Sequence, residues 1–397
     1  MNKLVILRDT DSSVTPLEVA GSFLEEIRER AAEFENQRHF SDDLARRMAG
    51  AGLYSLCTPK EYGGCGYTAR DYAEVSELVA RADASAGWCL FIGISSAIGI
   101  STVEDAKNMI LAPDNVTSGV FAPMGKARRE TVDGVDGYRI SGKWQWGSGS
   151  MNADWISGGF FVVDENGKPE KLADGRPDQN IATFARSEIE HLDTWHVSGL
   201  KGTGSTEYQV KDVFIPANRI RSIYDQKTPD YPVYKFPMYG FLGIGIAAVA
   251  LGIARAAIDE LIDLAGGKVP MASRRTLAEK VTTHREVAEA EAILRSARAF
   301  FYEAIDAAWQ GAEGDQPLTV DHRRDVRHST SHAVKSAKQV VEKMYLLGGG
   351  SSVFLTSPLQ RHLRDVNVAT QHMMVAPATF DLIGRMLVGL DTDVGQL

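Results

Sequence analysis

The chain has 397 residues, of which 44% are hydrophobic and 24% are charged, as is ordinary for a folded globular protein. This length suffices for roughly two or three domains. The formal net charge of -9 argues against nucleic acid as a partner, because a nucleic-acid-binding surface is basic. The three cysteines (Cys57, Cys65 and Cys89) form no CxxC pair, which indicates reduced thiols in a cytoplasmic protein.

No segment of the sequence resembles a targeting signal or a membrane span. Residues 1–13 are too charged, and their apolar part too short, for a signal peptide. The longest apolar run, Phe241–Ala254, is shorter than the roughly 18 residues of a membrane span, and glycines interrupt it. We therefore expect a cytoplasmic protein without a membrane partner.

The local sequence pattern changes twice along the chain. Helical patterns and a Pro- and Gly-rich loop at 58–68 precede residue 107, and the expected helices are 17–38, 42–50 and 69–82. Between about residues 116 and 221, short β-branched and aromatic runs predict strands, clearest at 138–141, 155–163 and 208–215. From Tyr239 the helical period returns and continues to the end.

Two apolar stripes with helical spacing mark the C-terminal part. They consist of Val287, Ala290, Leu294, Ala297, Phe301, Ala304 and Ala308, and of Val326, Ala333, Ala337, Val340 and Met344. Long helices with such stripes are best buried in a bundle. We expect an α+β fold with an N-terminal helical domain (1–117), a central β-barrel-like domain (118–230) and a C-terminal four-helix bundle (231–397).

This order of domains resembles the acyl-CoA dehydrogenase superfamily, and local segments agree with it. They are Gly52-Leu-Tyr with Pro59-Lys-Glu-Tyr-Gly-Gly, His196–Ser205 with Val213-Phe-Ile-Pro216, and Leu347-Gly-Gly-Gly350 followed by Arg361-His-Leu-Arg-Asp365. The resemblance covers roughly residues 17–390. It implies a flavin cofactor and a homotetramer in which a neighbouring subunit completes each flavin site.

The residues of a CoA-ester dehydrogenase are missing. Such an enzyme needs a glutamate to remove the proton alpha to the thioester carbonyl. No carboxylate occurs between Asp365 and Asp381, where most members of the family have it, and Phe236–Ile258 contains no acid either. The family's Thr-Glu-Pro segment is replaced by Phe121–Lys126. An acyl-CoA dehydrogenase with an unrecognised base therefore remains only as an alternative.

The sequence is more similar to the two-component (group D) flavin-dependent monooxygenases of the superfamily, which act on phenols, indoles or thiophenes. Their Trp-x-aromatic-x-Ser-Gly motif stands here as Trp144–Gly149, and their histidine after the Arg-Asp pair stands as His372. The resemblance implies that Ser148 hydrogen-bonds flavin N5 and that His372 acts on a C4a-hydroperoxyflavin. The reduced flavin (FADH2 or FMNH2) would come from a separate NAD(P)H:flavin reductase, with O2 as co-substrate.

The same resemblance assigns further residues to the cofactor. Trp144, Ser148 and Gly149 would contact the flavin, and Arg274 with Gly348, Gly349 and Gly350 would hold its phosphate. Alternatives stay open for several of these assignments. Ser148 could be only a turn residue and His372 a bundle histidine with a structural role. Trp144 could belong to the core, the glycines could be a plain helix C-cap, and Arg274 could be a surface residue.

The expected substrate pocket contains Trp88, Ser96 and Pro123. Several of the monooxygenases hold a phenol hydroxyl with a histidine at the position of Ser96, and a serine is no comparable base. We therefore expect a small aromatic or heteroaromatic substrate, with a neutral, indole-like ring favoured over a phenol. A non-catalytic flavin-binding relative is the second alternative.

Two other motifs suggest different ligands but do so weakly. Gly243-Ile-Gly245 is part of a dinucleotide fingerprint, yet it lies inside an Ala- and Gly-rich helical run rather than after a strand. His328 and His332 are one helical turn apart, but no nearby acid or cysteine completes a metal site. We expect helix packing for the first motif, a solvated face for the second, and no metal.

Overall fold

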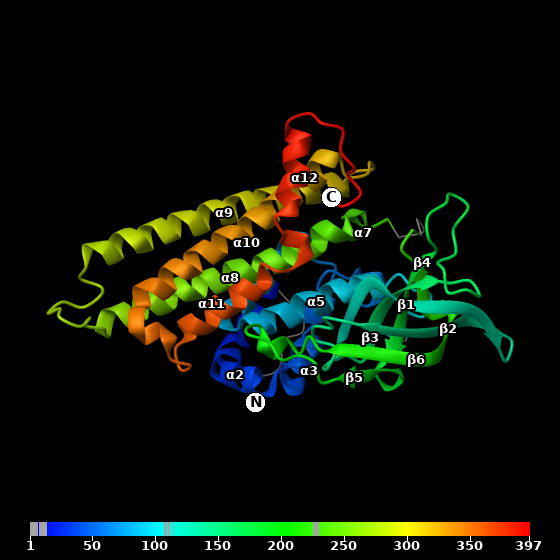
Figure 1. Ribbon diagram of the computed structural model, residues 1–397, viewed down its shortest axis with the longest axis horizontal. Helices are drawn as coiled ribbons and strands as arrows, with labels where there is room; N and C mark the ends of the chain where they lie inside the picture. The colour runs from blue at the N-terminus through cyan, green and yellow to red at the C-terminus, as the bar shows by residue number, and fades with distance from the viewer. Residues whose placement is uncertain (1–6, 8–13, 107–108, 110–111, 113, 225–229) are drawn as a thin grey trace.

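The computed structural model describes residues 7, 14–106, 109, 112, 114–224 and 230–397. Helices, a sheet and a second set of helices follow one another along the chain, as Figure 1 shows. The predicted α+β fold is therefore confirmed. Short 3-10 segments, η1 to η7, lie at Leu53–Ser55, Lys60–Tyr62, Arg186–Glu188, Lys201–Thr203, Ala217–Arg219, Gly349–Val353 and Met373–Val375.

The N-terminal part is helical. Its helices are α1 (Pro16–Gly21), α2 (Leu24–Gln37), α3 (Asp42–Gly50), α4 (Ala69–Ala82) and α5 (Ala84–Ile100). The predicted helix 17–38 is two helices, because the chain turns at Ser22, whose hydroxyl donates to the Val19 carbonyl. The predictions for α3 and α4 are correct to the residue, and a capping box between Thr68 and Asp71 starts α4.

The central part is one mixed sheet with the strand order β5-β6-β2-β1-β3-β4-β7. Its strands are β1 (Thr117–Val132), β2 (Val135–Trp144), β3 (Trp155–Val162), β4 (Gln179–Ala185), β5 (Glu190–Leu192), β6 (Glu207–Pro216) and β7 (Ile220–Ser222). Only β1 and β3 pair in parallel. The described strands thus form an open sheet with β5 and β7 at its edges, where the sequence predicted a barrel-like domain.

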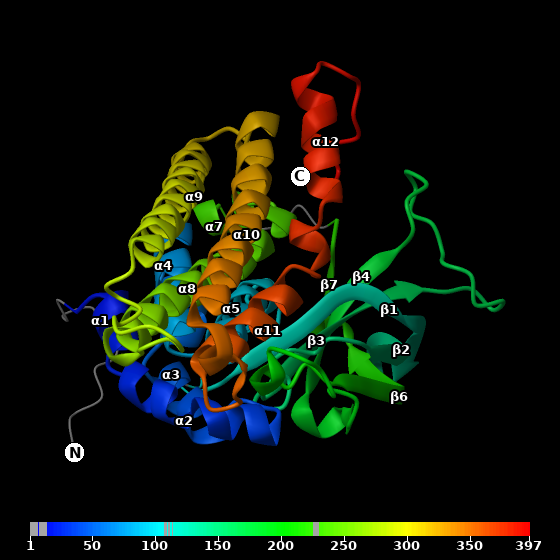
Figure 2. The same ribbon diagram turned by 60° about the vertical axis from the view of Figure 1, so that its left-hand side comes forward.

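The sheet is strongly curved around an aromatic core. The ring of Trp144 on β2 lies 5.5 Å from that of Phe184 on β4 and 5.3 Å from that of Tyr208 on β6. Two strands separate β2 from β4, so the rings of Trp144 and Phe184 meet only because the sheet bends. The two views of Figures 1 and 2 both show α5 beside β1, between the sheet and α8.

In the part of the chain that the structure describes, the C-terminal part is the expected bundle with two further helices, α7 and α12. It contains α7 (Pro232–Lys235), α8 (Met238–Gly267), α9 (Val281–Glu313), α10 (Val320–Gly348), α11 (Pro358–Ala369) and α12 (Ala378–Leu387). Helices α8 to α11 pack together, and both predicted apolar stripes are buried except for the half-buried Val287. Helix α8 is long and apolar enough to span a membrane, but 89% of its apolar window is buried in the protein, as in a core helix.

Candidate active site

A chain of buried hydroxyl groups lies where the turn after β2 meets α5. The Trp88 Nε1–H donates to Ser148 Oγ over 3.1 Å, and Ser148 Oγ lies 2.5 Å from Ser205 Oγ. Ser205 Oγ lies 2.6 Å from Thr203 Oγ1, which donates to the Leu200 carbonyl over 2.8 Å. All four side chains are buried, so these bonds are shielded from competing water.

The direction of the hydrogen bonds in this chain follows from its two ends. A carbonyl oxygen only accepts and a hydroxyl has a single hydrogen, so Thr203 must give its hydrogen to Leu200 and accept the hydrogen of Ser205. Ser205 must then accept the hydrogen of Ser148. Ser148 in turn accepts from Trp88 and keeps one free lone pair, which suits a ligand that presents an N–H donor. Reduced flavin has an N–H at N5, so these residues fit that cofactor.

His372 lies against the same tryptophan, in the segment that follows α11. Its ring centre is 6.1 Å from that of Trp88, and its Nδ1 accepts the Met374 N–H over 3.3 Å. This bond assigns the proton of the neutral ring to Nε2. Burial and, to a smaller extent, the charge of Arg327 lower the pKa of His372 to about 4. His372 is therefore a neutral imidazole near pH 7 with an N–H to donate.

Arg327 on α10 fixes the segment that carries His372. It donates to the Met374 carbonyl and, over 3.3 Å, to Thr379 Oγ1. Only 3% of its surface is exposed, and burial lowers the pKa of its guanidinium to about 10. No acidic partner for Arg327 occurs among the residues that the structure describes. The arginine thus brings a positive charge close to His372 while it ties the η7 backbone and the start of α12 to α10.

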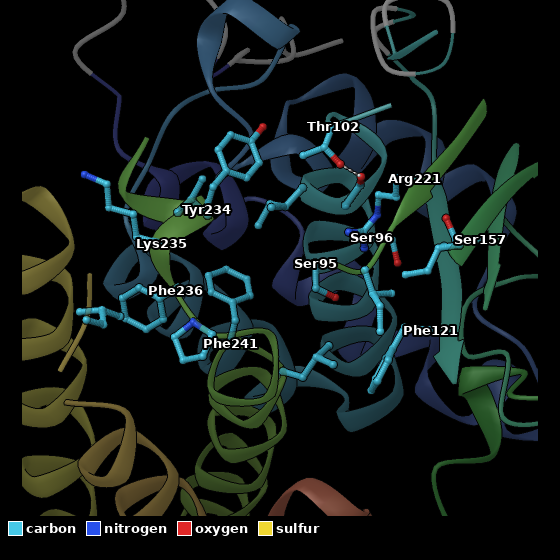
Figure 3. A pocket seen from close by; sticks show the side chains of 18 of the residues that line it. Ser95, Ser96, Thr102, Phe121, Ser157, Arg221, Tyr234, Lys235, Phe236 and Phe241 are labelled. Atoms are coloured by element: carbon cyan, nitrogen blue, oxygen red, sulfur yellow. Dashed lines mark hydrogen bonds between the residues drawn. The ribbon is translucent and has the colours of Figure 1, made fainter. Parts of the chain in front are cut away.

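A cavity of about 880 Å³ opens beside this cluster, between α5, the sheet and the start of α8 (Figure 3). This is a usual size for a small-molecule site. Its walls are mostly apolar and hydroxyl-bearing, and include Ile92, Ser95, Ser96, Phe121, Ser157 and Phe241. Among the described lining residues the one carboxylate is Asp315, which is exposed. Among the described residues, no buried carboxylate is therefore available to this cavity as a general base.

One face of α5 joins the hydroxyl chain to the cavity. Trp88, Ile92, Ser96 and Gly99 follow one another at helical spacing, and the last three line the cavity. Trp88 and Gly99 are separated by roughly 16 Å along the helix axis at 1.5 Å per residue. The two regions thus form one elongated site with α5 as its floor.

The structure brings some of the predicted site residues together and separates others. Ser148, Trp88 and His372 form one cluster, and Ser96 lines the cavity beside it. Trp88 itself is not a cavity wall residue, because its indole is turned towards Ser148.

Two of the predicted positions need correction. The Trp144 side chain is fully buried in the sheet, where its Nε1–H donates to the Gly159 carbonyl over 2.8 Å, so the core alternative holds and the indole has no surface for flavin. Pro123 does not line the cavity either. Irregular pairing of β1 with β3 on both sides of Pro123 breaks the strand alternation, and Phe121 reaches the cavity instead.

The loop between α8 and α9, which carries Arg274, and the glycine turn after α10 lie at the end of the bundle that is farther from the sheet (Figure 1). Lys268, which begins the loop that carries the exposed Arg274, donates to the Gly348 carbonyl. Along α10, Arg327 and Gly348 are separated by roughly 30 Å at 1.5 Å per residue. Within one subunit, the predicted phosphate-binding residues are therefore far from Ser148 and His372.

The two weak motifs have structural explanations. A Cβ on Gly245 would lie 2.2 Å from Tyr72 Oη, so this glycine lets α8 approach α4 and α5 closely. His328 is half-buried, with its ring 5.4 Å from Phe300 and 5.9 Å from Phe380, and His332 is also near Phe300. The expected solvated face is thus an aromatic contact between α9, α10 and α12. No metal-binding cluster occurs among the described residues.

The chain matches the family models of the acyl-CoA dehydrogenase N-terminal domain over residues 17–107 and C-terminal domain over residues 244–377. It is 34% identical to an indole-3-acetate monooxygenase of Pseudomonas putida, over 95% of each chain. The chain belongs to the acyl-CoA dehydrogenase superfamily. It is also 28% identical to the oxygenase component of the FADH(2)-dependent resorcinol hydroxylase of Rhizobium sp., over 92% of each chain.

A solved structure agrees with these sequence relatives. The crystal structure of 3-HSA hydroxylase from Rhodococcus sp. RHA1 matches this chain with a TM-score of 0.84 and 26% identity, over 96% of this chain and 99% of that one. This member of the acyl-CoA dehydrogenase superfamily therefore belongs to its flavin-dependent monooxygenases. The predictions of superfamily, fold and enzyme class are confirmed.

Sequence reasoning missed four residues of this superfamily member's site. Ser205 and Thr203 lie inside the segment that carried the resemblance, so their hydroxyls were visible signals. Arg327 and Arg221 gave no signal, because an arginine on a helix or at a strand end is usually at the surface. Only the tertiary structure places them beside His372 and in the cavity.

Proposed function

We propose that this chain is the oxygenase component of a two-component system that hydroxylates a small aromatic substrate with reduced flavin and O2. When bound, reduced flavin supplies the electrons that activate O2. The observation that carries the proposal is the Trp88–Ser148–Ser205 chain with the neutral His372 on the other side of Trp88. It offers an acceptor for an N–H and a donor for an oxygen atom in one dry site.

Ser148 is the residue that would hold flavin N5. Its remaining lone pair can accept the N5 hydrogen of reduced flavin, and Gly149 next to it has a φ of +70°, which lets the backbone turn sharply at this point. His372 would act on the oxygen that is transferred, by donating its Nε2–H. Because its pKa is about 4, His372 can donate as a neutral group throughout the physiological pH range.

The cavity supports an electron-rich ring as the substrate. Ser96 in its wall makes no hydrogen bond with another described residue, and no lining histidine or buried carboxylate can ionise a phenol. An indole-type ring needs no such base. We therefore favour an indole over a phenol as the substrate class, and the indole-3-acetate monooxygenase of Pseudomonas putida points the same way.

The two alternatives are less well supported. An acyl-CoA dehydrogenase needs a carboxylate base at the reacting carbon, and the described cavity wall offers only the exposed Asp315. A non-catalytic relative would not need a buried, neutral His372 that a buried arginine holds in place. We further propose a cytoplasmic homotetramer that receives its flavin from a separate NAD(P)H:flavin reductase.

The test is incubation of the purified protein with a flavin reductase, NADH, FAD or FMN, ¹⁸O₂ and a panel of indoles and phenols. We expect one ¹⁸O atom in the product and little hydrogen peroxide with the best substrate. His372→Ala removes the Nε2–H donor and should lower kcat by about 100-fold, because losing one preorganised hydrogen-bond donor at a reacting oxygen commonly costs roughly 10²- to 10³-fold. Bleaching of bound FAD by an acyl-CoA, with no ¹⁸O in any product, would support the dehydrogenase instead.

A further inference from the structure

An unpaired arginine lies in the cavity wall at the end farthest from Trp88 along α5. Arg221 belongs to the short strand β7, and its side chain crosses to α5, where a Cβ on Gly99 would lie 3.2 Å from Arg221 Nη2. No acidic side chain pairs with Arg221 anywhere in the described part of the chain. Burial lowers the pKa of its guanidinium to about 10, so it stays charged at pH 7.

Arg219, two residues earlier, is an example of an arginine with a structural role in this part of the fold. Arg219 pairs with Glu188 and also donates to the Thr183 carbonyl over 2.7 Å. Arg221 has no comparable partner among the residues that the structure describes, although leaving a buried charge unpaired costs several kcal/mol in general. A cation that the protein itself does not neutralise is suited to an anionic ligand.

Polar groups around Arg221 would complete a carboxylate site. Figure 3 shows the guanidinium in one corner of the cavity with Ser96 and Ser157 beside it. The Ser96 hydroxyl makes no other hydrogen bond within the described chain. An arginine with a nearby hydroxyl donor binds a carboxylate by charge-assisted hydrogen bonds, which are about twice as strong as neutral ones.

The other charged groups of the cavity are less suitable. The Lys235 ammonium already pairs with Asp230 at 2.8 Å and donates to the Gly314 carbonyl. Asp315 is exposed and negative. Arg323 also lines the cavity, and its buried Nε has no partner among the described residues, but it belongs to α10, whereas Arg221 belongs to β7 and lies against Gly99 of α5. Arg323 therefore serves as a matched control.

The spacing along α5 leaves room for a ring between the two ends of the site. Roughly 16 Å separate Trp88, which bonds Ser148, from Gly99, which contacts Arg221. A flavin ring at the Ser148 end and a bicyclic aromatic acid towards Arg221 can share this length. A substrate carboxylate at Arg221 would point the ring towards His372.

We propose that Arg221 and Ser96 bind a carboxylate of the substrate, so that the enzyme acts on an aromatic acid with a short side chain, of the indole-3-acetate type, rather than on a neutral ring. The inference rests on the proposed function, because it assumes that the substrate occupies this cavity. It narrows the indole-like class predicted from the sequence to its carboxylates.

The experiment compares indole-3-acetate with indole-3-acetamide, which has nearly the same shape without the charge. Binding is measured by calorimetry under anaerobic conditions in the presence of reduced flavin. We expect wild type to bind the acid at least about 10-fold more tightly than the amide, since hydrogen bonds between charged groups are worth that much. Arg221→Met should weaken binding of the acid by about 10- to 100-fold and leave binding of the amide within about 3-fold. Arg221→Lys should bind the acid with an affinity between those of wild type and Arg221→Met.

Controls separate this role from a structural one. Arg323→Met should change binding of neither ligand by more than about 3-fold, and Arg221→Met should melt no lower than wild type, because it removes an unpaired charge. The inference is overturned if wild type does not prefer the acid, if Arg221→Met weakens both ligands equally, or if Arg323→Met causes the loss. The proposed function fails separately, if neither ligand gains ¹⁸O whatever the binding results are.

Discussion

At the scale of single residues, the polarity of the hydroxyl chain is the most specific feature of the site. Ser148 presents a lone pair rather than a hydrogen only because Ser205 takes the hydrogen, and Ser205 does so because Thr203 is committed to the Leu200 carbonyl. The Leu200 carbonyl thus sets the preference of Ser148 for an N–H, three hydroxyls away. Oxidised flavin has no hydrogen at N5, so this order of bonds should favour the reduced form.

We predict that Ser205→Ala weakens the preference of the protein for reduced over oxidised flavin. The Ser148 hydrogen is then free and can be donated to oxidised N5. The ratio of the two dissociation constants should change by about 5-fold, the value of one hydrogen bond of about 1 kcal/mol. Anaerobic titration with each flavin form measures it. Ser150→Ala is the control, since its hydroxyl bonds His191 instead. An unchanged ratio in Ser205→Ala would show that the chain does not set this preference.

A second histidine makes the stability of the fold sensitive to acid. His362 on α11 is buried, and its Nε2 has no hydrogen-bond partner among the described residues. Burial and the charge of Arg361 lower its pKa from 6.5 to about 3. Below pH 6.5 His362 is therefore protonated in the unfolded chain but stays neutral in the folded chain. The free energy of unfolding consequently falls as the pH decreases from 6.5 towards 3. Burial raises the pKa of the neighbouring Asp365 to about 7, and this acid acts in the opposite direction.

The effect of His362 is isolated by comparing wild type with His362→Met at each pH. Between pH 8 and pH 5.5 the free energy of unfolding of wild type should fall by about 1.4 kcal/mol more than that of the variant, as expected for one group with an unfolded pKa of 6.5. Denaturant melts at several pH values measure the difference. Parallel curves for the two proteins would mean that His362 is not kept neutral in the fold.

At the scale of elements, glycines decide how closely α8 approaches its neighbours. A Cβ at Gly245 would lie 2.2 Å from Tyr72 Oη and 2.4 Å from Phe91, both in rigid aromatic rings. A Cβ at Gly243 would meet only the Thr330 side chain, at 3.2 Å or more. The two glycines of the apparent dinucleotide motif lie on one helix, but only the position of Gly243 can accommodate a larger side chain.

We predict that Gly245→Ala lowers the melting temperature by roughly 3–6 °C, since overpacking costs about 1–3 kcal/mol. It should also disturb Phe91 and, through α5, the Trp88–Ser148 bond. Gly243→Ala is the matched control and should melt within about 2 °C of wild type, because alanine favours a helix by about 1 kcal/mol over glycine. Equal losses in the two variants would contradict this explanation of the motif.

Helix ends that are marked by a capping residue or a glycine could be predicted from the sequence. Features that depend on contacts between distant parts of the chain could not. Helices α3 and α4 were predicted to the residue because a terminal glycine and a capping threonine mark their ends. The break after α1 depends on a single hydroxyl bond of Ser22. Ser148 and His372 were predicted as site residues through the resemblance, and the structure places both beside Trp88. Arg221 could not be predicted as a site residue. What distinguishes it is the lack of an acidic partner among the described residues, and only the tertiary structure shows this.

At the scale of the whole molecule, the two ends of the predicted flavin site are in different places. Ser148 and His372 lie beside the sheet, and the glycine turn lies roughly 30 Å away at the far end of α10. The short ribityl linker of a flavin cannot cover that distance within one subunit. Large apolar side chains are also exposed at this far end, among them Met271 at 98% and Leu355 at 86%. Both observations favour an oligomer in which the turn serves a neighbour.

Complementation between subunits tests this arrangement. His372→Ala removes the N–H donor at the reacting end of the site. Gly350→Asp places a negative charge at the glycine turn, where the added side chain meets open space and should not disturb the fold. Each variant alone should be nearly inactive. If every site combines His372 of one subunit with Gly350 of another, randomly mixed oligomers from co-expression should regain about a quarter of wild-type activity. If both ends belong to one subunit, every site in the mixture carries one defect, and activity should stay at the level of the separate variants. Mixed oligomers are purified through a different tag on each variant, and their activity is expressed per wild-type His372. This value decides whether the glycine turn contributes to the site of a neighbouring subunit.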